Sequence, residues 1–153
     1  LTLGMVIVTF TVVLLRYLFN IGWIAMQESI TYMHALVFML GAAYTLKHDG
    51  HVRVDIFYRA LSLKARAWVD LLGTLILLLP VTLYLFWVSW DYVTGSWSIR
   101  EGSLQTGGMP AIYLLKTTLL VMPALLILQG AAMLLRQLTI ILGIRAEASE
   151  AGQ

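Results

Sequence analysis

The stretch LLGTLILLLPVTLYLFWVSW, residues 71–90, decides the fold class of this chain. Asp70 and Asp91 bracket it, and no charged residue interrupts it. An α-helix of about 20 residues crosses the ~30 Å hydrocarbon core of a bilayer. Tryptophans stand at both ends, where aromatic side chains anchor a helix at the membrane interfaces. We therefore predict a membrane-spanning helix over about residues 67–93, kinked at Pro80.

Three more apolar stretches, over about residues 1–19, 29–46 and 110–138, predict three more spans. The first, counted from Leu1, is shorter than the ~20 residues that cross a bilayer, so we expect a missing turn or two before it. The composition agrees: 60% of the 153 residues are apolar and 12% are charged, whereas a soluble domain is about half apolar and about a quarter charged. The bilayer must cover the remaining apolar surface.

We therefore expect an all-α integral membrane protein: one domain of four transmembrane helices over residues 1–145 and a disordered polar tail over 146–153. The chain has no cysteine. This excludes disulfides, iron–sulfur clusters, thiolate zinc sites and cysteine nucleophiles.

The charged segment between the second and third spans sets the predicted orientation. Within it, Val54, Phe57, Tyr58 and Leu61 recur at helical spacing, which predicts a short amphipathic helix over about residues 53–62 on the cytoplasmic interface. Short loops rich in lysine and arginine stay in the cytoplasm. Both termini are then cytoplasmic, and nucleic acid is not an expected partner, because the basic residues do not follow one polar face. The basic residues of this loop are Lys47, Arg53, Arg59, Lys64 and Arg66, against Arg16 and Arg100 in the other connections.

The histidines allow two chemical interpretations. His34, within the second span, could ligate haem or relay protons, but no second histidine lies at matching depth, so a hydrogen bond to a neighbouring helix or subunit is the simpler interpretation. In the loop, imidazoles and carboxylates could converge on a metal ion, yet their spacing matches no recognised site, and a solvated turn explains them. These loop residues are His48, Asp49, His51 and Asp55.

Ionised groups near the outer hydrocarbon boundary need partners or must reach the headgroups. Arg16, Lys116 and Glu28 are predicted at similar depth, so Glu28 could bridge to Arg16 or to Lys116, or each could extend to the headgroups independently. Asp70 and Asp91 lie a bilayer apart and cannot share one cation. We expect them to end the apolar stretch and to pair with nearby bases such as Arg66 or Arg100.

No motif for enzymatic chemistry is present. The chain contains no nucleophile elbow, zinc-protease helix, Walker loop or dinucleotide fingerprint. It also lacks the repeats and charged midplane residues of a self-sufficient transporter. The pattern is typical of a membrane scaffold.

One segment resembles a known family. GAAYTLKHDGHVRVDIF, residues 41–57, is similar to the signature of the small membrane subunit of TRAP (tripartite ATP-independent periplasmic) transporters, in which a small-residue helix end leads through Gly-His-Val-x-Val into an interfacial helix. RYLFN at 16–20, EGSLQTGGMP at 101–110 and LLILQG at 125–130 agree in order and spacing. One departure is Gln27 beside Glu28, where members often have two acids.

The resemblance implies a division of labour in a bacterial inner membrane. A large subunit, moving as an elevator, carries the substrate and sodium, and a periplasmic protein captures the substrate, usually an organic acid. The small subunit buttresses the scaffold, helps to dock the binding protein and needs no cofactor of its own.

Three sets of residues are candidates for these roles. Docking candidates in the outer connections are Trp23, Glu28, Arg100, Glu101, Ser103 and Gln105. Packing candidates, whose small side chains let helices approach closely, are Gly41, Ala42, Ala43, Gly130, Ala131 and Ala132. The cytoplasmic turn and interfacial helix contain Gly50, His51, Arg53, Asp55 and Phe57.

The alternative function is an unrelated four-span membrane anchor of a redox enzyme, with His34 as a cofactor ligand. A haem absorption band that is lost on His34→Ala would favour that alternative.

Overall fold

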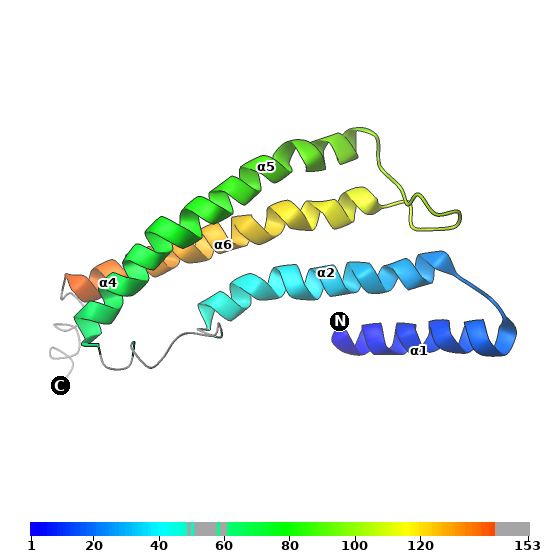
Figure 1. The fold of residues 1–153 in the computed structure, drawn as a ribbon, viewed down its shortest axis with the longest axis horizontal. Helices are drawn as coiled ribbons and strands as arrows, with labels where there is room; N and C mark the ends of the chain where they lie inside the picture. Colours follow the sequence, from blue (N-terminus) through cyan, green and yellow to red (C-terminus); the bar gives the residue numbers. More distant parts are fainter. Residues whose placement is uncertain (49, 51–57, 59–60, 143–153) are drawn as a thin grey trace. The chain divides into compact units, whose positions relative to one another are not determined.

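The computed structural model describes residues 1–48, 50, 58 and 61–142, and these are mostly helical, with no strand among them (Figure 1). Four helical stretches are long and apolar enough to cross a membrane. The predicted all-α membrane fold is thus confirmed. The stretches are α1 (Thr2–Phe19), α2 (Ile24–Lys47), the continuous run of α4 (Leu63–Gly73), η1 (Thr74–Leu78) and α5 (Leu79–Ser98), and α6 (Ile112–Ile141).

The second and third helices are longer than the apolar stretches that predicted them. α2 begins at Ile24 rather than near residue 29, so most of the expected connector is helical. The third stretch begins at Leu63, where the Ser62 hydroxyl accepts a hydrogen bond from the Ala65 amide at 3.3 Å and caps the helix. Hydrophobicity marks the part of a helix that lies in lipid, whereas capping decides where the helix ends.

Most of the predicted interfacial helix over residues 53–62 lies outside the described residues, as does the predicted tail over 146–153. His51, Arg53, Asp55 and Phe57 lie outside them too.

Asn20 ends the first helix. It adopts the left-handed conformation, with φ 56° and ψ 28°, and the amides of Asn20 and Ile21 both point back to the Leu15 carbonyl. Asparagine accepts this conformation better than most residues, so it can reverse the chain directly after the span. The short connector to α2 follows from this cap.

The helices contribute to two compact units. The first contains residues 1–42 and 86–122, and the second contains the described residues of 43–85 and 123–153. Within the first, α1 lies against α2 so closely that a methyl group on Gly4 would be 3.5 Å from the Met33 sulfur.

The π turn η1 adapts the third span to Pro80. Proline has no amide hydrogen and its ring clashes with the carbonyl four residues earlier. In the turn just before it, the Leu79 amide bonds to the Thr74 carbonyl, five residues back. The hydroxyls of Thr74 and Thr82 donate to the Asp70 and Leu78 carbonyls, both at 2.7 Å. The wider turn and the threonines thus supply hydrogen bonds around the proline.

Gly130 of α6 packs against this turn, within the second unit. A Cβ placed on Gly130 would lie 3.1 Å from a Leu78 methyl carbon and 3.2 Å from one of Leu79. Of the other packing candidates, Ala131 and Ala132 are exposed. A Cβ placed on Gly41 would have no atom of another residue within 4 Å beyond its own helix backbone and chain neighbours. One of the predicted small residues therefore joins two helices of this chain, and the exposed ones leave space for other molecules.

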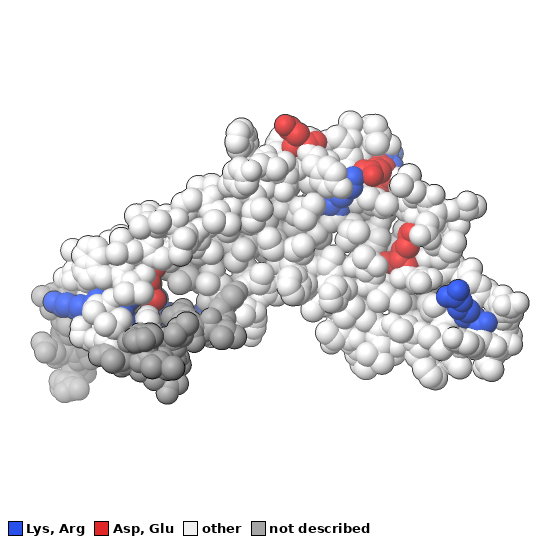
Figure 2. All heavy atoms as spheres, viewed as in Figure 1, with Lys and Arg blue, Asp and Glu red and all other residues white. Residues whose placement is uncertain are grey.

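The surface of the described chain is largely apolar. Large side chains are more than half exposed on every span, for example Phe10, Phe38, Leu77 and Leu128. Figure 2 shows charged side chains only as separate spots on the face in view. Such a surface is compatible with lipid and incompatible with water.

Substituting Gly130 by valine should destabilise the protein by about 1–3 kcal/mol, because a branched side chain would overpack the contact with Leu78 and Leu79. Thermal unfolding in detergent measures this. Ala131→Val, at the exposed neighbouring position, should leave the midpoint almost unchanged, and equal losses in both variants would contradict the packing role of Gly130.

Candidate functional site

Glu28 of α2 holds the loop between α5 and α6. One of its carboxylate oxygens accepts a hydrogen bond from the Ser103 hydroxyl at 2.5 Å, and the other accepts one from the Met109 amide at 2.7 Å. We call Glu28, Ser103 and Met109 the loop clamp. All three belong to the first compact unit. A carboxylate that accepts two hydrogen bonds is a strong restraint, so the clamp fixes both arms of the loop to α2.

The loop is also bonded to itself. The Ser103 amide donates to the Met109 carbonyl at 2.9 Å, and the Gly108 amide donates to the Gln105 carbonyl at 3.0 Å. Gly107, between them, has φ +79°, a conformation that glycine adopts at little cost. The result is a compact, ordered tip.

A second interaction joins the start of the loop to α6. The Lys116 ammonium lies 2.5 Å from a Glu101 carboxylate oxygen and 4.0 Å from the centre of the Tyr92 ring. The side chains of Lys116 and Glu101 are 15% and 29% exposed, so water only partly screens the pair. The hydrogen bond from Lys116 lowers the pKa of Glu101 below its ordinary value.

Trp97, at the end of α5, provides a third link within the first unit. Its indole nitrogen donates to the Thr117 hydroxyl at 2.9 Å, and its ring meets the Tyr113 ring edge-on at 4.7 Å between centroids. An amphipathic ring with a hydrogen-bonded nitrogen is suited to the membrane interface. The ends of α5 and α6 are thereby held together.

The tip of the loop presents an apolar side chain to the surroundings. Leu104 is fully exposed, and Ile99, on the same connection, is 73% exposed. Gln105 and Arg100 are exposed as well, and Arg100 has φ 46° where the chain leaves α5. Exposed apolar side chains on a fixed loop are typical of a contact surface.

The docking candidates thus divide into two groups. Glu28, Glu101 and Ser103 are internal supports, whereas Trp23, Arg100 and Gln105 are exposed. The sequence left open a bridge from Glu28 to Arg16 or Lys116, or separate extension to the headgroups. In the structure Lys116 binds Glu101, and Glu28 binds the loop. The sequence could not reveal the partners of Glu28 and Lys116, because these partners depend on which face of each helix points into the protein.

Two contributors were missed by sequence reasoning. Met109 takes part through its backbone amide, which has no side-chain signature. Leu104 was passed over because a lone leucine in a polar loop carries no periodic signal, although its full exposure makes it prominent.

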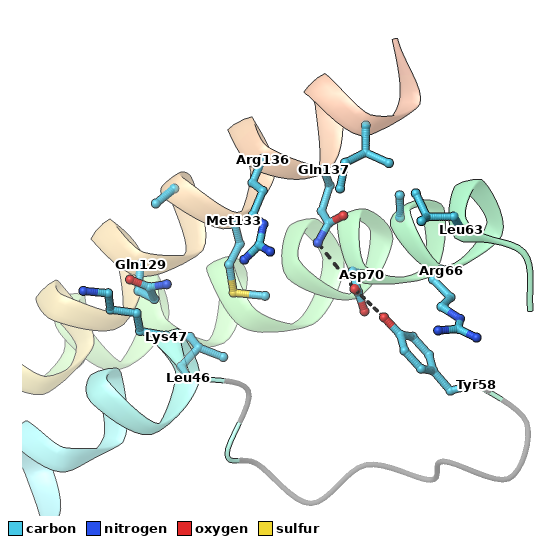
Figure 3. Close-up of a pocket in the computed structure, with 13 residues that line it drawn as sticks. Leu46, Lys47, Tyr58, Leu63, Arg66, Asp70, Gln129, Met133, Arg136 and Gln137 are labelled. Carbon is cyan, nitrogen blue, oxygen red and sulfur yellow. Dashed lines mark hydrogen bonds between the residues drawn. The ribbon is translucent and has the colours of Figure 1, made fainter. Parts of the chain in front are cut away.

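A separate polar pocket lies in the second compact unit (Figure 3). In its lining, the Asp70 carboxylate accepts a hydrogen bond from the Tyr58 hydroxyl at 2.6 Å and one from the Gln137 amide at 3.4 Å. The Arg66 guanidinium lies 5.5 Å from the centre of the Tyr58 ring. Asp70 therefore does more than end an apolar stretch, because it links α4 to α6.

The histidines show no ligand set in the described part of the chain. His34 is exposed and stacks on Phe38, with ring centroids 6.3 Å apart, and His48 lies against Tyr44. No group of three metal-binding side chains occurs among the described residues. Asp49, His51 and Asp55, the other three residues considered as metal ligands in the loop, lie outside the described residues.

The comparison with protein families decides what this scaffold is. The model of the DctQ component of tripartite ATP-independent periplasmic transporters matches residues 5–140. The chain belongs to this family. No curated protein matches this chain.

The family match, residues 5–140, includes most of the first span, all of the second and third, and all but the last residue of the fourth. It identifies the chain as the small subunit of a TRAP transporter, a family whose members associate with a large membrane subunit and a binding protein and are non-catalytic in general. It favours the transporter over the redox-enzyme anchor that His34 had suggested. The resemblance seen in the sequence is thus confirmed.

Replacing Glu28 by glutamine should loosen the loop, since the charged acceptor for Ser103 and Met109 would be lost. We expect hydrogen exchange at the amides of residues 103–109 to quicken on the order of tenfold. Asp91→Asn, an exposed carboxylate in the same unit, is the control and should change nothing there. An unchanged loop in Glu28→Gln would show that the clamp does not restrain it.

The pair of Glu101 and Lys116 should depend on pH. Because the pKa of Glu101 is lowered in the folded protein, its contribution to stability is present at neutral pH and is lost as the pH falls through that lowered value. Glu101→Gln should therefore lower the unfolding temperature at pH 7, and the difference from the original protein should shrink towards pH 3. A difference that stays constant with pH would contradict the role of the ion pair.

Proposed function

We propose that this chain is the fixed, non-catalytic buttress of a sodium-coupled importer of organic acids, and that its outer loop helps to dock the periplasmic binding protein. The large subunit would carry substrate and sodium, and this chain would need no cofactor. The loop clamp carries the proposal, since a carboxylate on a spanning helix holds the loop on both arms. A docking surface gains from such preorganisation, because less freedom is lost on binding.

The exposed residues at the tip fit a transient contact. Leu104 offers one apolar anchor, with Gln105 and Arg100 as polar neighbours. An interface of one anchor with a polar rim binds weakly, which allows the binding protein to leave after delivery.

The apolar exterior supports the buttress role. The described residues of α1 include no buried one, and large side chains such as Val6 and Phe10 are exposed along it. Such faces are available to lipid or to the large subunit, and the exposed Ala131 and Ala132 would let a partner helix approach closely.

The proposed location is the bacterial inner membrane, with both termini in the cytoplasm. The segment from Lys47 to Arg66 holds more basic residues than the outer connections, which supports this orientation. The clamped loop would then face the periplasm, where a binding protein can reach it.

Sodium-driven uptake of organic acids into proteoliposomes tests the proposal. Vesicles containing the large subunit and supplied with the binding protein should take up substrate only when this chain is present. Undiminished uptake without it would refute the essential buttress.

Substitution of Leu104, at the tip of the loop, tests docking of the binding protein. Leu104→Asp should raise, by roughly tenfold, the concentration of binding protein that gives half-maximal uptake, the size of effect expected at an interface anchor. Leu142→Asp places the same change at a leucine 69% exposed after α6, at the other end of that span, and should have no such effect. Equal effects of the two substitutions would contradict docking through Leu104.

A further inference from the structure

The polar pocket of the second unit has the position of a lipid-headgroup site. Its cationic lining residues lie at ends of spans: Lys47 is the last residue of α2, Arg66 is near the start of α4, and Arg136 is near the end of α6. Because consecutive spans alternate in direction, these three ends share one side of the membrane. The pocket therefore lies at headgroup depth in one leaflet.

The described lining of the pocket carries more positive than negative charge. Among the described residues, Lys47, Arg66 and Arg136 line it, with the single carboxylate of Asp70. This carboxylate accepts hydrogen bonds from the Tyr58 hydroxyl and the Gln137 amide, and among the described residues neither Lys47 nor Arg136 forms an ion pair. Both side chains are exposed and can reach an arriving ligand. An anion is the ligand that such a lining attracts.

The pocket also has apolar walls. Leu46, Leu63, Met133 and Ile140 line it beside the basic groups, and its volume is about 640 Å³. Figure 3 shows Met133, Arg136 and Gln137 extending from α6, with Lys47 and Leu46 on the end of α2 and Leu63 on α4. A small hydrated anion gains no favourable contact from apolar walls, whereas a phospholipid places a phosphate next to glycerol and acyl carbons that can contact them.

We propose that this pocket binds the headgroup of an anionic phospholipid. Lys47 and Arg136 contact the phosphate, Gln129 donates a further hydrogen bond, and the apolar walls cover the upper acyl carbons. Basic pockets between membrane helices on the cytoplasmic side recognise such headgroups. The bound lipid would join the ends of α2, α4 and α6, which belong to one compact unit at this pocket.

The test measures binding of phosphatidylglycerol and of phosphatidylcholine with the same acyl chains to the full chain in detergent, by native mass spectrometry. Phosphatidylglycerol should bind more tightly. Lys47→Gln and Arg136→Gln should each weaken its binding about fivefold, and should hardly change that of phosphatidylcholine. Arg136→Lys should keep the preference and serves as the folded control if the glutamine variant is unstable. Arg16→Gln, an exposed arginine in the first unit, should keep it as well.

Equal binding of the two lipids would overturn the proposal. So would an equal loss in Arg16→Gln and Arg136→Gln, because the attraction would then be a property of the whole surface. Free inorganic phosphate could supply the same anionic group, so thermal unfolding is also measured with sodium phosphate. Protection by inorganic phosphate that phosphatidylglycerol does not exceed would identify a free-phosphate site and reject the lipid.

Discussion

The absence of water from the bilayer core governs this structure. Every backbone amide and carbonyl there must find its hydrogen bond within the protein, which leaves the helix as the only form for spans of this kind. The π turn near Pro80 obeys this constraint too, since the turn and the hydroxyls of Thr74 and Thr82 supply bonds to the backbone. The contact of Gly130 with that turn shows how a local adjustment in one helix becomes a packing surface for another.

Polar interactions concentrate where the helices leave the lipid. Glu28 and the pair of Glu101 and Lys116 hold the loop in the first unit, and Asp70 with Tyr58 and Gln137 joins helix ends in the second. In each case the charged group is bonded, because an ionised side chain near hydrocarbon is costly without a partner. Bonded polar groups at the helix ends and apolar sides along the helices are what the proposed fixed buttress would require.

The tip around Leu104 and the pocket around Lys47 and Arg136 differ in chemistry, and we have proposed different ligands for them. Around Leu104 a rigid tip combines one apolar side chain with polar neighbours, which suits reversible contact with a soluble protein. In the second unit, Lys47 and Arg136 stand beside apolar walls, which suits an amphipathic anion.

The four spans were predictable without a structure, because the length and hydrophobicity of residues 71–90 and of the other apolar stretches are one-dimensional properties. The sequence also indicated the family, through motifs such as RYLFN and EGSLQTGGMP, and the segments in which the polar contacts lie. The partners of the polar groups follow from the three-dimensional arrangement: Lys116 binds Glu101, Glu28 binds Ser103 and the Met109 amide, and Tyr58 binds Asp70. A hydrogen bond requires its donor and acceptor to lie within a few tenths of an ångström of the optimal separation, even when the two groups are as distant in the chain as Glu28 and Met109. Helix rotation, caps and backbone amides set those distances, and none of them is written in the hydrophobic pattern.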